Sequence, residues 1–282
     1  MEHWTPHRPD ENDDEWLRLL PPLPAAPASS EPPSPEPPRR RRWFTAVVAI
    51  VVGIGLLASA ASLGTRARHP TPQERGGPKF SFIDTKMSGD PVRWNPCEPI
   101  HYVVNDALAR YPEAIADAHV AAQRVSEATG IEFVYDGETT EEAAPGRSSF
   151  QLRYGKEWAP VLIAWTDPDD SPIEFERGSH VALGVASPSI PTHGRFDMFV
   201  SGWVALNADY AGPGGFDSPS SVGLTIQHEL GHVMGLGHTK AFGELMQGAG
   251  GGALDWGPGD LEGLRALGAE AGCLTTPDAE AA

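Results

Sequence analysis

The eleven residues from His228 to His238, H-E-L-G-H-V-M-G-L-G-H, constrain the fold of this chain more than any other segment. His228 and His232 are four residues apart, so a helix would place their side chains on one face, one turn apart. Gly235 follows three residues later, where a glycine can adopt a positive φ, end the helix and turn the chain. The turn would bring His238 back toward the first two histidines. The spacing therefore predicts a helix that ends near Gly235 and three imidazoles that meet at one point.

Three imidazoles that meet form a ligand set for zinc. Their nitrogens can bind one ion at about 2.0–2.1 Å and leave a fourth position open, as in catalytic rather than structural zinc sites. Zinc lowers the pKa of a bound water toward about 7 and polarises a carbonyl group. Glu229 lies next to the first ligand and can reach that water, so it is the candidate general base. The pattern predicts hydrolysis of a peptide bond without a covalent intermediate.

A methionine downstream extends the pattern, because Met246 lies eight residues after His238. With the eleven-residue run, it gives the chain a resemblance to the metzincin zinc peptidases, in particular to their matrixin-like bacterial type. The resemblance is specific over residues 220–268 and weaker back to about residue 91. It implies the following roles: His228, His232 and His238 bind one catalytic zinc, Glu229 is the general base, Gly235 forms the turn, and Met246 supports the site without being a ligand.

The resemblance also implies an α+β fold with a twisted mixed sheet of about five strands, two long helices and a small C-terminal subdomain with one helix. The sequence indicates strands at 100–104, 131–135, 161–165, 181–186 and 199–206, and helices at 112–129, from 220 or 221 onward, and at 261–267. In metzincins, an edge strand above the zinc pairs with the substrate backbone. The segment 181–186 resembles that strand in its order and placement. Asp260 is expected to cap the last helix and is also a candidate partner of the turn that contains Met246.

An uncharged stretch at residues 43–63 predicts a membrane anchor. As a helix it spans about 31 Å, close to the hydrocarbon thickness of a bilayer. Four arginines, 39–42, precede it and are expected to stay in the cytoplasm, so the catalytic part would be extracytoplasmic in a single-pass membrane protein. The alternative is a secretory signal peptide cleaved near Ala58-Ser59-Ala60, which would release the protein.

The amino-acid composition along the chain indicates the boundaries of its domain, linker and tails. We expect a disordered, Pro-rich, acidic cytoplasmic tail at 1–42, the transmembrane helix at 43–63, a linker at 64–90, the zinc peptidase domain at 91–275 and a disordered tail at 276–282. The net charge of −17 argues against a nucleic-acid partner. The expected partners are a polypeptide substrate and, through one span, the membrane. The sequence contains no signal for the oligomeric state.

The chain has two cysteines, Cys97 and Cys273, near the two ends of the expected domain. Outside the cytoplasm they can form a disulfide that ties these ends together. The alternative is a cysteine that blocks zinc, as in the propeptide of matrixins. The residues around Cys97, W-N-P-C-E-P, do not match that propeptide motif. We therefore favour the disulfide.

Further metal sites have less support. Asp167, Asp169 and Asp170 form an acidic turn that is able to take a cation, but no calcium motif is recognisable. Matrixins carry a second, structural zinc, whereas the surroundings of His180 and His193 do not match that site. We expect both to be ordinary surface histidines.

Two other functions stay open at this point. The chain is either the peptidase described above, a zinc amidohydrolase that acts on cell-wall peptides, or a non-catalytic binding module on a metzincin scaffold. The presence of Glu229 favours an enzyme.

Overall fold

The computed structural model describes residues 78–282 except 178–179, 192–196, 211, 249–251 and 281–282. The expected cytoplasmic tail, membrane span and first part of the linker lie outside these residues, as does His193. Within the described residues, no helix is long and apolar enough to cross a bilayer.

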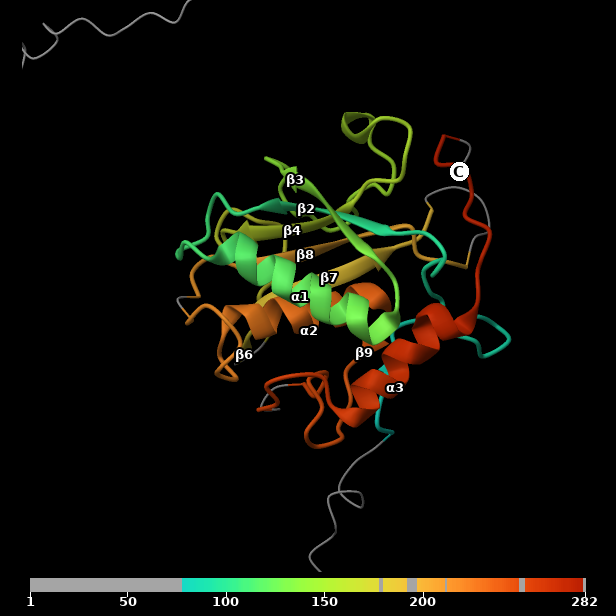
Figure 1. The fold of residues 1–282 in the computed structure, drawn as a ribbon. Coiled ribbons are helices and arrows are strands. Elements are labelled where there is room, and N and C mark those ends of the chain that lie inside the picture. Colours follow the sequence, from blue (N-terminus) through green and yellow to red (C-terminus); the bar gives the residue numbers. More distant parts are fainter. Residues whose placement is uncertain (1–77, 178–179, 192–196, 211, 249–251, 281–282) are drawn as a thin grey trace, which may run out of the picture. The chain divides into compact units, whose positions relative to one another are not determined.

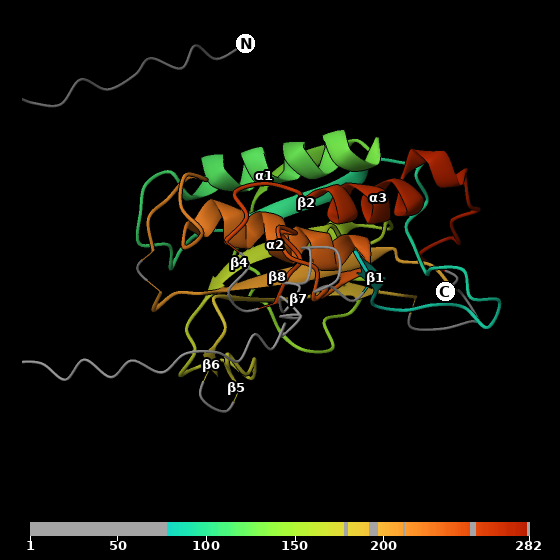
Figure 2. The ribbon, with the colours of Figure 1, turned by 90° about the horizontal axis from the view of Figure 1, so that it is seen from below.

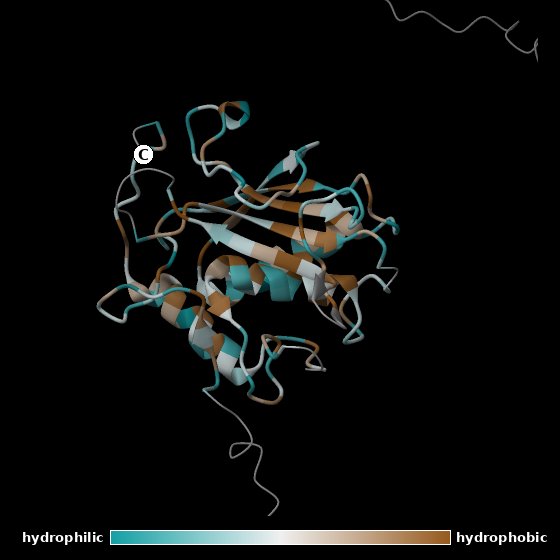
Figure 3. Cartoon of the chain, turned by 180° about the vertical axis from the view of Figure 1, so that it is seen from behind, coloured by the Kyte–Doolittle hydropathy of each residue, from teal (hydrophilic) through white to brown (hydrophobic). Residues whose placement is uncertain are grey.

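A five-stranded mixed sheet forms the centre of the described domain (Figure 1). Its strands are β2 (Ile100–Asn105), β3 (Phe133–Glu138), β4 (Val161–Thr166), β7 (Gly184–Ser189) and β8 (Ser201–Asn207). They lie in the order β3-β2-β4-β8-β7, with the first four parallel and β7 antiparallel to β8. Strands β4 and β8 are buried along their whole length, which explains their nearly continuous hydrophobic sequences (Figure 3).

Two helices cover one face of this sheet, α1 (Ala114–Thr129) and α2 (Val222–Met234) (Figures 1 and 2). The buried stripe of α1 consists mostly of alanines, which allow α2 to pack closely against it. Helix α1 ends at Gly130, which has a φ of 71°. The α+β class and the mixed sheet of five strands were predicted from the sequence and are confirmed.

The third helix, α3 (Pro258–Leu267), follows the predicted Met-containing turn. Short elements complete the described domain: strands β1 (Ser81–Phe82) and β9 (Leu236–Gly237) pair with each other, β5 (Glu176–Arg177) pairs with β6 (His180–Val181), and η3 (Leu152–Tyr154) and η4 (Ala269–Ala271) are single 3-10 turns. The predicted strand at 181–186 is shifted in the structure, because Val181 belongs to β6 and the sheet strand β7 runs from Gly184 to Ser189.

The packed domain extends beyond both predicted boundaries. The linker was expected to run to residue 90, but Ser81 and Phe82 pair with β9. The expected disordered tail also packs, since Trp158 Nε1 donates to the carbonyl of Pro277 at 3.1 Å and Ala279 is buried. Isolated hydrophobic residues between glycines and prolines carry no periodicity, so their long-range partners were not visible in the sequence.

The predicted disulfide between Cys97 and Cys273 is present. It joins residues 176 positions apart, and Asn95 strengthens the junction because its Oδ1 accepts hydrogen bonds from the backbone N–H groups of Cys97 and Leu274. The two ends of the domain are therefore held together by one covalent bond and a local hydrogen-bond network.

Replacing both cysteines with serine is expected to lower the free energy of unfolding by about 3–5 kcal/mol. The reason is that the bond closes a very long loop and restricts the unfolded chain. Denaturant titration of the oxidised wild type and the Cys97→Ser/Cys273→Ser variant measures the difference. Wild type treated with a reducing agent serves as the control and should behave like the variant. Equal unfolding midpoints in all three samples would contradict the prediction.

Candidate metal centre

Helix α2 carries two of the three predicted ligands and ends as the sequence indicated. Its last residue is Met234, and Gly235 follows with a φ of 111°, in the left-handed region that favours glycine. At the other end, Ser221 is the N-cap residue by backbone geometry. Its hydroxyl accepts a hydrogen bond from the N–H of Ser218 and does not cap the helix.

The three predicted ligands converge. The Nε2 atom of His238 lies 3.1 Å from the Nε2 atoms of both His228 and His232. A tetrahedral ion with bonds of 2.0–2.1 Å places its ligand nitrogens about 3.3 Å apart. These two distances fit one zinc ion with only small adjustments, and the ligand atoms of all three histidines lie within 4.8 Å of one another. Within the described residues, this is the only group of three or more histidine, cysteine or carboxylate side chains whose ligand atoms come together.

The first two imidazoles are held in the tautomer that binds metals. His228 Nδ1 lies 2.7 Å from the carbonyl oxygen of Leu245, and His232 Nδ1 lies 2.7 Å from that of Leu236. A carbonyl only accepts hydrogen bonds, so each Nδ1 carries the proton and each Nε2 presents a lone pair. Burial lowers the pKa of His228 to about 4 and that of His232 to about 3. Both rings are therefore neutral near pH 7, which is the form that coordinates zinc.

Glu229 lies in the same cleft as the three histidines, and the residue is 6% exposed. The edge strand β7 passes close to it, because a Cβ atom added at Gly184 would lie 2.7 Å from Glu229 Cγ. Only a glycine leaves room for the Glu229 side chain at this position. The sequence did not indicate this role for Gly184.

The cleft beside the histidines has a volume of about 820 Å³. Its lining includes the segment 181–186 and, from other parts of the chain, Leu224, Thr225 and Leu245. Apart from Glu229 and the three histidines, the described lining residues are uncharged. Ile83 and Val181 line the cleft and remain 46% and 59% exposed. The cleft therefore presents apolar surface to whatever enters it.

Met246 occupies the position that the sequence indicated. Its side chain is buried against α2, where a Cβ atom added at Gly231 would lie 2.6 Å from the Met246 sulfur. The turn around it is fixed by Asp260, whose carboxylate accepts hydrogen bonds from the N–H groups of Leu245 and Met246. The predicted contact between Asp260 and this turn is confirmed. The N-cap residue of α3, however, is Gly257, and Asp260 reaches back to its N–H at 2.9 Å.

Asp260→Asn is expected to lower the free energy of unfolding by about 2–4 kcal/mol. An amide has one acceptor oxygen where the carboxylate has two, so buried N–H groups of the turn lose their partner. Thermal unfolding of the metal-free protein measures the loss. Asp278→Asn, a change in an exposed residue near the C-terminus, is the control.

The same variant should change how stability depends on pH. Burial raises the pKa of Asp260 from 3.8 to about 6, so the folded chain holds this proton more tightly than the unfolded chain. Wild-type stability is therefore expected to include a part that is present below pH 4 and is lost as the pH rises toward 6. The difference in stability between wild type and Asp260→Asn should shrink over that interval. A difference that stays constant from pH 4 to pH 7 would contradict the assignment.

The acidic turn considered for calcium has a local explanation. Asp167 Oδ1 accepts a hydrogen bond from the N–H of Asp169 at 2.9 Å, which is a typical turn contact. Its carboxylates do not form a metal-binding group with other described residues. The side chain of His180 and all of His193 lie outside what the structure describes.

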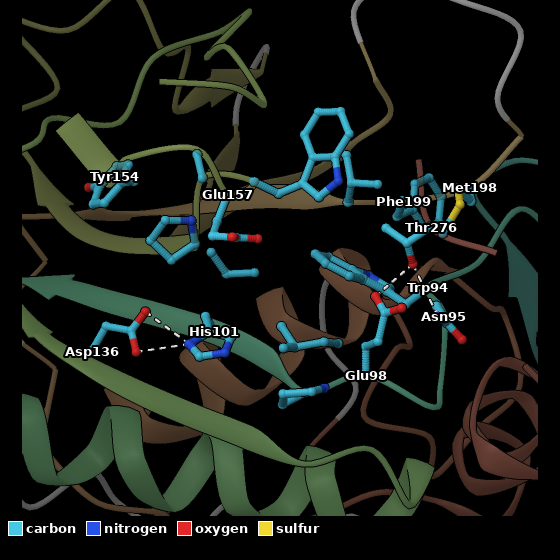
Figure 4. A pocket seen from close by; sticks show the side chains of 17 residues that line it. Trp94, Asn95, Glu98, His101, Asp136, Tyr154, Glu157, Met198, Phe199 and Thr276 are labelled. Carbon is cyan, nitrogen blue, oxygen red and sulfur yellow. Dashed lines mark hydrogen bonds and ion pairs between the residues drawn. The ribbon is translucent and has the colours of Figure 1, made fainter. Parts of the chain in front are cut away.

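A second cavity, of about 540 Å³, lies where β2 and β4 begin and shares no lining residue with the histidine cleft (Figure 4). His101 Nδ1 pairs there with Asp136 at 2.9 Å, and Glu98 accepts a hydrogen bond from Thr276 at 2.6 Å. Two of its three lining carboxylates are thus engaged with neighbours. The cavity shows no arrangement of nucleophile and base or of metal ligands.

A scan against family models and a search of curated proteins both find no match for this chain.

Proposed function

We propose that this chain is a zinc-dependent endopeptidase of the metzincin type. One observation carries the proposal: the ligand atoms of three histidines lie within 4.8 Å of one another, with two Nε2–Nε2 distances of 3.1 Å, in a cleft that Glu229 also lines. His228, His232 and His238 would hold the zinc, and Met246 would support them from below.

The residues divide the chemistry between them. Zinc, when bound, supplies Lewis acidity and activates a water molecule for attack on a carbonyl carbon. Glu229 accepts a proton from that water as the new C–O bond forms. Glu229 then passes the proton to the amine nitrogen as the C–N bond breaks. The products are a carboxylate and an amine, and no covalent bond to the protein forms.

The edge strand β7 supports a polypeptide substrate. Among the described strands it pairs only with β8, so its other edge is open toward the cleft. An extended peptide can add to such an edge through main-chain hydrogen bonds. The apolar lining and the exposed side chains of Ile83 and Val181 favour a substrate with apolar side chains on either side of the cleaved bond.

An extracytoplasmic position of this domain remains part of the proposal. The disulfide supports it, because such bonds persist in oxidising compartments and are rare in the cytosol. The membrane anchor at 43–63 is still a prediction from the sequence alone.

A fluorescence-quenched peptide library tests the function directly. The full chain loaded with zinc is expected to cleave library peptides, to lose activity with a zinc chelator, and to regain it when zinc is added. Cleavage of purified cell-wall fragments but of no library peptide would favour the amidohydrolase. One bound zinc per chain with no cleavage of either would favour a binding module.

A further inference from the structure

The segment Pro78–Ile83, here called the N-terminal strap, lies directly against the residues that carry the third ligand. Ser81 and Phe82 pair antiparallel with Gly237 and Leu236. The N–H of Ile83 donates to the carbonyl of Gly235 at 2.8 Å. The strap therefore follows the chain from the end of α2 to the residue before His238.

The strap also contacts His238 and the residue after it. Ser81 Oγ donates to the carbonyl oxygen of His238 at 2.8 Å, and Thr239 Oγ1 donates to the carbonyl of Pro78 at 2.6 Å. The strap packs closely against Gly237, because a Cβ atom added at this glycine would lie 2.7 Å from Ser81 Oγ. Three consecutive residues, 237 to 239, thus each contact the strap.

The third ligand differs from the first two in how its backbone is held. His228 and His232 belong to α2, where the helix fixes their positions. His238 follows the two-residue strand β9 and lies in no helix. Its position relative to the other two rings depends on what packs against this short segment. The strap supplies its contacts with residues 235–239 from a distant part of the sequence.

Helix α3 also packs against the strap. A Cβ atom added at Gly263 would lie 3.1 Å from the Phe80 ring, and one added at Gly259 would lie 2.5 Å from the carbonyl oxygen of Lys79. Both glycines lie in α3 and leave room for the strap. Asp260 of α3 also holds the turn that contains Met246. The same helix therefore contacts both this turn and the strap.

We infer that the N-terminal strap positions the third zinc ligand, and that Ser81 is a positioning residue for His238. The inference rests on the proposed zinc site. Zinc affinity would then depend on a segment that lies within the predicted linker, 64–90. Anything that displaces the strap, such as a cut within it or a competing strand, would weaken zinc binding without touching a ligand side chain.

The test compares zinc affinity in full-length variants, by competition with a chromophoric chelator. Ser81→Ala is expected to weaken zinc binding about tenfold, the lower end of the effect seen when an interaction that orients a metal ligand is removed. Ser88→Ala is the matched control, because its hydroxyl bonds only Asp90 in an exposed turn. Ser81→Thr keeps the hydroxyl and should restore most of the affinity.

Two further measurements separate positioning from general stability. The unfolding midpoint of the metal-free protein should be nearly the same for Ser81→Ala and wild type. The visible spectrum of the cobalt-loaded variant should change, since the third nitrogen is displaced. Unchanged zinc affinity of Ser81→Ala would overturn the inference, as would weaker binding explained by an equal loss of metal-free stability. A wild type that binds no zinc is a distinct result, which removes the proposed function itself.

Discussion

Glu229→Ala is expected to bind zinc as wild type does and to cleave peptides about 100- to 10,000-fold more slowly, the range for loss of a positioned general base. Glu229 belongs to the same cleft as the histidines, and strand β7 leaves room for its side chain at Gly184. Removing the Glu229 carboxylate leaves the imidazole nitrogens of His228, His232 and His238 in place. The rate of cleavage by single-turnover kinetics and the zinc content of the same sample are the two measurements.

Two variants sharpen this result. Glu229→Gln keeps the shape of the side chain without its basicity, so its loss of rate should approach that of Glu229→Ala. Glu127→Ala removes an exposed carboxylate on α1 and should retain wild-type activity. If Glu229→Ala still cleaves peptides at a wild-type rate, then another group acts as the base and the assigned role is wrong.

His238→Ala is expected to weaken zinc binding by more than about 100-fold, because loss of a ligand should exceed the 10- to 100-fold effect of losing a group that only orients one. The other two nitrogens remain preorganised by the carbonyls of Leu245 and Leu236, but two ligands hold zinc poorly. Dialysis against a competing chelator followed by elemental analysis measures the retained metal.

The control for this variant is His101→Ala, which removes a histidine of the second cavity and should keep one zinc per chain. A His238→Ala protein that also retains one zinc per chain under the same conditions would mean that a different residue is the third ligand. Loss of zinc from both variants would point to misfolding rather than to coordination.

The grouping of the three histidines was partly predictable because two of them are close in sequence on one helix. His228 and His232 share one helix, and Gly235 sets the turn that follows, so spacing alone brings the first two ligands together. The turn at Gly235 also explains why His238 comes back toward them, whereas its contacts with the strap were not visible in the sequence. A supporting role of Met246 was expected only from the resemblance, and its contact with Gly231 of α2 was not predicted.

The features that the sequence did not indicate depend on main-chain groups or on partners that are distant in sequence. The Nδ1 atoms are held by main-chain carbonyls, and any residue type at 236 or 245 supplies one. Ser81 and Gly184 come from segments far from the histidines, with no motif to connect them. The sheet order β3-β2-β4-β8-β7 likewise depends on pairing between strands that are not consecutive in sequence.

The hydrogen bonds that orient His228 and His232 have a consequence for how this protein tolerates genetic change. Both acceptors are peptide oxygens, at Leu245 and Leu236, and a codon change alters a side chain but leaves the peptide group intact. Most amino-acid substitutions at Leu236 and Leu245 should therefore leave the orientation of the His228 and His232 rings unchanged, as long as the backbone keeps its conformation. Sequence drift at these two positions can therefore change the side chains near the histidines while the orientation of the imidazole rings stays the same.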